Sequence, residues 1–301
     1  MNRAALRPYI WMLLGSLSFA VMSTMAHMLG TRCDWQIIAL ARSGLAFLFA
    51  TTLAIFAGSK LVMWRPGILW MRSIAGSISL VGGFFALTRL PVSDVLTLTN
   101  TFPIWIAVLS WPVLGEMPSR RVWLSVVCGV SGAALMQQPH FAEGNFAALV
   151  ALGCSFSTAI AMLGLHRLHA VDVRAIVVHF SGVSFLFCIG SLFCFDRDPK
   201  LAALPDGRAI VMLLAIGLTA TAGQIMLTKA FKAGAPAKVS VVGLSQVVFA
   251  MILDLLLLQH TFDTLKVVGM LLVLGPTAWL MVSERRAHVA APEIEEECLP
   301  V

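Results

Sequence analysis

Three charged side chains stand inside long apolar stretches of the sequence, where an ionised group is costly to bury and is often functional. The guanidinium of Arg42 could hold a carboxylate or a phosphate through two parallel hydrogen bonds. A structural ion pair, or a side chain that reaches the polar interface, explains Arg42 about as well. Asp254 lies at a comparable depth in a later stretch, so the two could form a gate that an anionic solute opens. Arg72 stands nearer the end of its stretch, as an interfacial anchor or a second contact for the anion.

Uncharged polar residues form a stripe in the stretch that follows residue 90. Ser93, Thr97, Asn100 and Thr101 follow one another at i, i+4, i+7 and i+8, so a helix places them on one face. In hydrocarbon such a face must meet protein or water, and it therefore lines a solute cavity or a helix–helix contact. Pro103 follows the stripe and is expected to kink the helix.

Two amides and one indole are further candidates for contact with a solute. Gln224 and Gln246 lie within apolar stretches, and their amide groups can bind zwitterions or anions. Trp105 could line an apolar cavity, although ordinary packing accounts for it as well. These three residues, with Thr97, Asn100, Arg42 and Arg72, make up the predicted substrate-binding set.

Proton coupling would need a titratable group on the solute path. His27, His179 and Asp254 are the candidates for gating or coupling, and His27 stands near the end of its stretch, where a histidine is often solvated. No Walker motif, HExxH or GxSxG occurs, and the six cysteines show no metal-like spacing. We therefore expect no catalytic residues, no metal, no cofactor and no enzymatic activity.

The composition indicates which elements position these residues. Of the 301 residues, 59% are hydrophobic and only 12% are charged, too few charges to cover a water-soluble surface. A membrane-spanning helix needs about 20 apolar residues, and the runs are continuous rather than alternating, which favours helices over a barrel. The predicted spans are Pro8–Leu29, Trp35–Ala57, Leu69–Leu90, Val92–Gly115, Ser119–Gln137, Asn145–His166, Asp172–Phe195, Ala209–Ala233, Pro236–Gln259 and Leu265–Val282.

The distribution of Lys and Arg predicts the orientation. With a cytoplasmic N-terminus, fourteen of the 21 basic residues fall on the inner side and six on the outer side, while Arg42 lies within a span. Both termini are then cytoplasmic, and the short loops indicate a multi-pass protein of the cell inner membrane. The first apolar run is long enough to span and lacks a clear cleavage site, so it is not expected to be a signal peptide.

An internal repeat divides the chain. At an offset of 138 residues, the segment 43–49 (SGLAFLF) matches 181–187 (SGVSFLF), and further matches follow in order at offsets of 137 and 143. Each unit has an odd number of spans, five, so the second copy enters the membrane from the opposite side, as in many secondary transporters. The predicted fold is all-α integral membrane, ten transmembrane helices as two inverted five-helix repeats at 1–140 and 141–284, with a disordered cytoplasmic tail at 285–301.

Two segments resemble a known family. The stretch 85–94 (FALTRLPVSD), followed by 114–116 (LGE), resembles the EamA family of the drug/metabolite transporter superfamily, and 230–237 (AFKAGAPA) is a weaker echo in the second half. The second half carries Gln259 where the family commonly has a glutamate. The resemblance implies a ten-helix inverted-repeat fold and export or exchange of metabolites, amino acids or drugs.

The expected function is secondary transport of a small metabolite, with a lean toward an organic anion or an amino-acid-like solute, by alternating access. The predicted partners are this small-molecule substrate and the lipid bilayer, with no nucleic acid, because the basic residues form no face or arm. A membrane scaffold or receptor without transport, or an intramembrane enzyme, remains the alternative. Substrate identity, direction, coupling, oligomeric state and the role of the acidic tail stay open at this stage.

Overall fold

Twelve α-helices and no strand make up the part of the chain that the computed structural model describes. It describes the backbone of residues 6–30, 32–87, 89–90, 92–138, 146–194, 206–258 and 263–290, and the side chains of these residues apart from Leu87, Val92, Ser93, Asp254, Leu257, Leu258 and 284–290. The predicted side-chain roles of Ser93 and Asp254, and the tail beyond 290, therefore lie outside the described residues. The all-helical fold class is confirmed.

The helices follow the predicted spans closely. The first half of the chain holds α1 (Arg7–Leu29), α2 (Trp35–Phe56), α3 (Gly67–Leu87), α4 (Val92–Thr99), α5 (Phe102–Leu114) and α6 (Arg120–Gln137). The second half holds α7 (Phe146–His166), α8 (Val173–Cys194), α9 (Gly207–Ala233), α10 (Pro236–Gly243), α11 (Ser245–Leu258) and α12 (Thr264–Ala290). Side chains cap several of the N-termini: Asp34 accepts from the backbone of α2, Ser119 from that of α6 and Asp206 from that of α9.

Two predicted spans are each divided into two helices. The span predicted at Val92–Gly115 is broken between α4 and α5, where a kink was expected. Pro103 explains the position, because its ring excludes the carbonyl of the residue four positions earlier, Thr99, which is the last residue of α4. The span predicted at Pro236–Gln259 is broken at Leu244, between α10 and α11, where the sequence has no proline.

Nine segments of the described chain are long and apolar enough to cross a membrane, judged by length and composition. The α4–α5 pair supplies one of them and the α10–α11 pair another. The helix α6 is not among the nine, because Arg120, Arg121 and Gln137 lower its mean hydropathy. The chain is thus a multi-pass membrane protein.

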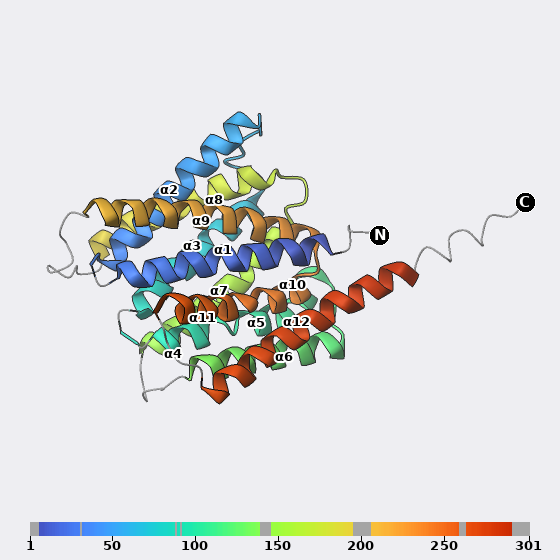
Figure 1. Ribbon diagram of the computed structural model, residues 1–301. Helices are drawn as coiled ribbons and strands as arrows, with labels where there is room; N and C mark the ends of the chain where they lie inside the picture. Colours follow the sequence, from blue (N-terminus) through green and yellow to red (C-terminus); the bar gives the residue numbers. More distant parts are fainter. Residues whose placement is uncertain are drawn as a thin grey trace, which may run out of the picture.

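The helices of the first half pack against those of the second in a reciprocal pattern (Figure 1). The helix α1 packs along α9 and α3 packs along α7, while α2 pairs with α8 and α6 with α12. Between α6 and α12 the backbones meet directly, since a Cβ on Gly132 would lie 2.7 Å from the carbonyl oxygen of Gly269. The interior of the molecule is therefore the interface between its two halves.

The α2–α8 contact contains the same packing twice. A Cβ on Gly44 would lie 2.9 Å from the ring of Phe185, and a Cβ on Gly182 would lie 3.1 Å from the ring of Phe47. Gly44 and Phe47 occupy the same places in the segment 43–49 as Gly182 and Phe185 do in 181–187. The matching segments found in the sequence thus lie face to face, and the glycine of each segment packs against the phenylalanine of the other.

Candidate functional site

The two broken helices bring backbone groups and polar side chains into the interior. Ser16 on α1 donates a hydrogen bond to the carbonyl oxygen of Gly243, the last residue of α10, at 3.3 Å. In the other half, Ser155 on α7 lies 3.0 Å from the hydroxyl of Thr101, in the break between α4 and α5. The first helix of each half therefore supplies a serine to the broken helix of the other half, where carbonyls leave the regular helix pattern.

Ser155 also fixes the orientation of Trp105. The indole Nε1 of Trp105 donates to the Oγ of Ser155 at 3.0 Å, and Ser155 in turn donates to the carbonyl oxygen of Leu152 at 2.7 Å. The ring of Phe156 lies edge to face against Trp105, with centroids 5.4 Å apart. The predicted contact residue Trp105 is thus half-buried between α5 and α7, and Ser155 and Phe156 hold its ring in one orientation.

Arg72 is only 1% exposed, and among the described charged residues only Asp94 is buried to the same extent. Its Nη2 donates to the Oε1 of Gln224 on α9 at 3.2 Å, and its guanidinium carbon lies 3.8 Å from the centroid of the Phe180 ring on α8. The Nε and Nη1 groups are buried without a hydrogen-bond partner, and no described carboxylate forms an ion pair with Arg72. Two predicted binding residues, Arg72 and Gln224, are therefore brought together across the interface.

Two glycines make room for Arg72. A Cβ on Gly76, one turn along α3, would lie 2.6 Å from its Nη1 and 2.8 Å from the ring of Phe180. A Cβ on Gly164 of α7 would lie 3.3 Å from the Cβ of Arg72. The guanidinium thus lies against the surface of its own helix, between α3, α8 and α9, and does not extend outward from the helix end.

A polar seam beside Arg72 joins α3 to α8. The Nδ1 of His179 lies 2.8 Å from the Oγ of Ser73, and its Nε2 lies 3.2 Å from the carbonyl oxygen of Met63. The carbonyl can only accept, so Nε2 carries the proton and Nδ1 accepts from the Ser73 hydroxyl in the neutral ring. One turn further along, the hydroxyls of Ser77 and Ser184 are 2.9 Å apart. The coupling candidate His179 is buried and has both ring nitrogens hydrogen-bonded.

The other predicted residues are more scattered. Arg42 on α2 is half-buried and makes no hydrogen bond or ion pair with the described residues. Thr97 is buried with an unpartnered hydroxyl, and Asn100 is half-buried in the break between α4 and α5. Gln246 is half-buried near the start of α11, and His27 is exposed at the end of α1.

The predicted pairing of Arg42 with Asp254 finds no support in the helix packing. The helix α2 packs against α8, α9 and α3, whereas α11, which carries Asp254, packs against α1, α12 and α10. The side chain of Asp254 is outside the described residues.

Several residues that make polar or aromatic contacts in the interior were not predicted from the sequence. Phe180, Ser73, Ser77 and Ser155 carry the contacts described above, but each is a residue type common in membrane helices. Ser73 and Ser77 are spaced i and i+4 on one face of α3, and this spacing could have indicated the polar seam between α3 and α8. Asp94, whose side chain is 1% exposed, was also not singled out.

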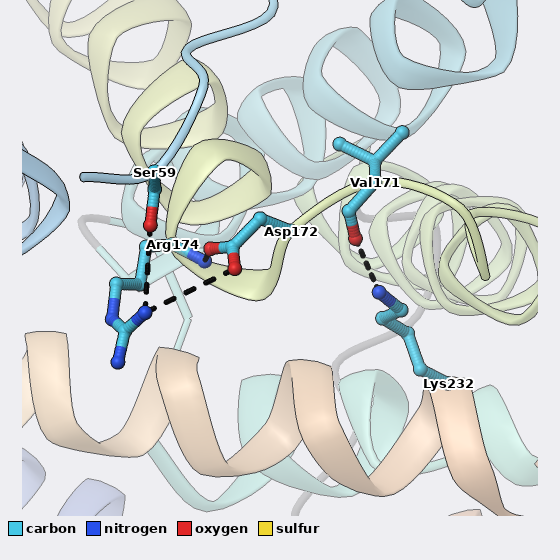
Figure 2. Close-up of polar contacts among 5 residues, drawn as sticks. All are labelled: Ser59, Val171, Asp172, Arg174 and Lys232. Atoms are coloured by element: carbon cyan, nitrogen blue, oxygen red, sulfur yellow. Dashed lines mark hydrogen bonds and ion pairs between the residues drawn. The ribbon is translucent and has the colours of Figure 1, made fainter. Parts of the chain in front are cut away.

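The segment that joins α7 to α8 makes polar contacts with the α2–α3 loop and with the end of α9 (Figure 2). Arg174 lies 3.9 Å from the carboxylate of Asp172, and its Nη1 donates to the hydroxyl of Ser59, in the α2–α3 loop, at 3.4 Å. Lys232 near the end of α9 donates to the carbonyl oxygen of Val171. Exposed contacts of this kind add little stability, but the hydrogen bond from Arg174 to Ser59 links the first turn of α8 to a loop of the first half.

Helices that can span a membrane, together with broken helices and buried polar groups in the interior, are typical of secondary transporters. The sequence profile of the EamA-like transporter family matches residues 6–137 and 145–282. The chain belongs to this family, so the resemblance seen in the sequence is confirmed. Membership implies a small-molecule substrate and embedding in a membrane.

Characterised relatives and a solved structure are similar over most of the chain. The pseudopaline exporter CntI of Pseudomonas aeruginosa strain UCBPP-PA14 is 27% identical over 262 residues, which cover 86% of this chain and 90% of the exporter. A riboflavin transporter of Rhizobium johnstonii is 22% identical over 235 residues, 74% of each chain. A crystal structure at 17% identity superposes with a TM-score of 0.78 over 94% of this chain and 98% of the other, and it shows the shared fold.

Proposed function

We propose that the protein is a secondary transporter that carries a small organic metabolite across the cell inner membrane by alternating access, in export or exchange. The observation that carries the proposal is the polar interior, because its groups come from both halves of the chain. Arg72 and Gln224 face each other from α3 and α9, and each broken helix is met by a serine of the opposite half. A site built between two halves can open to either side when the halves move against each other.

The architecture in this proposal is ten transmembrane helices in two inverted five-helix repeats. The family profile matches the chain twice, at 6–137 and 145–282, which supports a duplicated unit. The reciprocal pairing of α1 with α9 and of α7 with α3 is the pattern expected of two such units related by a two-fold axis. The tenth span would be α6, which packs along α12. Both termini are then cytoplasmic.

The names of the relatives support a metabolite as cargo. Pseudopaline and riboflavin, named for two of them, are both small organic molecules. The relatives share at most 27% identity with the chain, so they support the class of solute and not its identity.

Reconstitution of the purified protein into liposomes tests this proposal. Vesicles with and without the protein would be loaded with a labelled panel of neutral, cationic and anionic metabolites, and efflux would be followed over time. We expect selective, saturable flux of at least one solute through the protein-containing vesicles. Flux equal to that of empty vesicles for every member of the panel would favour a membrane scaffold instead.

A further inference from the structure

The Arg72 guanidinium is a buried cation whose hydrogen-bonding capacity is largely unused. A guanidinium has five N–H donors, and the described contacts account for one of them, to Gln224. Nε and Nη1 are shielded from solvent and have no acceptor. Buried polar groups are nearly always hydrogen-bonded and buried charges are nearly always paired. An arginine with a purely structural role would therefore be expected to have a carboxylate or several carbonyl partners here.

The surroundings fix Arg72 in place without neutralising it. Phe180 covers one face of the guanidinium at 3.8 Å, and the amide oxygen of Gln224 holds one edge at 3.2 Å. Gly76 and Gly164 provide the space, as a Cβ at either position would meet Arg72 within 3.4 Å. A flat, pre-oriented guanidinium with vacant N–H groups is suited to an oxyanion, which can accept two or more of these hydrogens at once.

Arg42, the other arginine predicted to bind an anionic solute, has no comparable setting. It is half-buried, and neither a hydrogen bond nor a ring contact with the described residues holds its guanidinium. A charge that is not held in one geometry provides attraction but little selectivity. The contrast favours Arg72 over Arg42 as the residue that recognises the solute.

The geometry points to Arg72, held by Gln224 and Phe180, as the binding site for the anionic group of the transported solute, a carboxylate or a phosphate. The inference rests on the proposed transport function and names the chemical class of its substrate. The site draws Arg72 from the first half and its two holding residues from the second, so movement of the halves would assemble and release it. Because the side chain is 1% exposed, the solute reaches it only after such a movement.

Vesicle transport by variants is the first test. The panel contains carboxylates, phosphate monoesters and, for each, the neutral amide or alcohol, so that the two sources of negative charge are distinguished. We expect the wild-type protein to carry an anionic member and not its neutral counterpart. Arg72→Gln should lower its flux by about thirty-fold or more, as expected when one partner of a buried charged contact is removed.

The matched control is Arg89→Gln. Arg89 also lies over a phenylalanine ring, at 3.9 Å from the centroid of Phe85, but it is exposed near the end of α3. Its flux should remain at the wild-type level. Wild-type flux in Arg72→Gln, or selective transport of only neutral or cationic solutes by the wild type, would overturn the inference.

A second measurement does not depend on finding the solute. Gln224→Cys is introduced into a chain whose six native cysteines are replaced by serine or alanine, and its labelling rate is compared for an anionic and a cationic methanethiosulfonate reagent. With Arg72 present, the anionic reagent should react about ten-fold faster relative to the cationic one. The preference should persist in Arg72→Lys and disappear in Arg72→Gln. A preference that is absent from the start, or unchanged by Arg72→Gln, contradicts an anion site.

The two measurements distinguish failure of the proposed transport function from failure of the proposed anion site. If the proposed function is wrong, the wild-type vesicles carry no solute, while the thiol labelling still reports the charge of the site. If only the inference is wrong, solute flux persists and Arg72→Gln leaves it unchanged.

Discussion

Gln224→Glu is a substitution for which the structure predicts opposite effects on stability and on transport. The new carboxylate would lie about 3.2 Å from the Nη2 of Arg72, the distance of the present hydrogen bond. At an effective dielectric constant of about 20, two unit charges at this distance attract by about 5 kcal/mol. Burial of the carboxylate costs several kcal/mol, so the net stabilisation is on the order of 1 kcal/mol. This corresponds to a rise of roughly 2 °C in the unfolding temperature.

The same substitution supplies Arg72 with a permanent anion, which the solute must then displace. Loss of even 2 kcal/mol of the attraction for an anionic solute weakens its binding by about thirty-fold. We therefore expect the half-saturating solute concentration in vesicles to rise by at least about ten-fold, while thermal unfolding in detergent shifts slightly upward.

Gln36→Glu is the matched control. Gln36 is also fully buried, but its amide donates to the carbonyl oxygen of Ser191 at 3.2 Å, and it lies next to the capping carboxylate of Asp34. A glutamate here replaces a donor by a second acceptor, so the unfolding temperature should fall. The reasoning about Arg72 is refuted if Gln224→Glu lowers the unfolding temperature as much as Gln36→Glu does, or if it transports with wild-type affinity.

Three further substitutions test the space beside Arg72, the hydrogen bond of Trp105 and the contact between α6 and α12. Gly76→Ala places a Cβ 2.6 Å from the Nη1 of Arg72 and should lower the initial flux by about ten-fold, whereas Gly83→Ala, which meets nothing within 4 Å in the same helix, should leave it unchanged. Trp105→Phe keeps the aromatic ring but removes the indole donor, and we expect it to cost about 1 kcal/mol in thermal unfolding; no change would mean that this hydrogen bond is unimportant. Gly132→Leu inserts a side chain where the backbone of α12 lies 2.7 Å from a Cβ, and overpacking should destabilise the protein by about 1–3 kcal/mol, as measured by unfolding in detergent.

The membrane helices could be predicted from the sequence because their signal is local. Continuous apolar runs of spanning length are sufficient to locate them, and every predicted span corresponds to one helix or to a broken pair. The break before Pro103 was partly foreseen, since proline excludes the carbonyl of Thr99. The break at Leu244 was not, because it has no proline and is held by a distant contact, from Ser16 to the carbonyl of Gly243.

The candidate site was only half predictable. Arg72 and Gln224 were both singled out, but nothing in the sequence indicates that they meet, since they are 152 residues apart. Arg72 lies in the second turn of α3, close to its predicted inner end, where a long side chain can equally well reach water. Only the tertiary structure shows the guanidinium turned inward, because Gly76 leaves the space and Phe180 covers it. The sequence likewise does not separate Arg42 from Arg72, whereas the structure shows no hydrogen bond or ion pair of Arg42 with the described residues.

Counterflow in reconstituted vesicles tests the central claim of alternating access most directly. Vesicles are loaded with a high concentration of the unlabelled solute identified in the panel and diluted into a trace of the labelled form. A carrier whose binding site faces one side at a time returns with labelled solute bound, so we predict a transient accumulation of label above its external concentration, lost in Arg72→Gln. A gradual approach to equilibrium without this overshoot would contradict the account and indicate an open pathway between the halves.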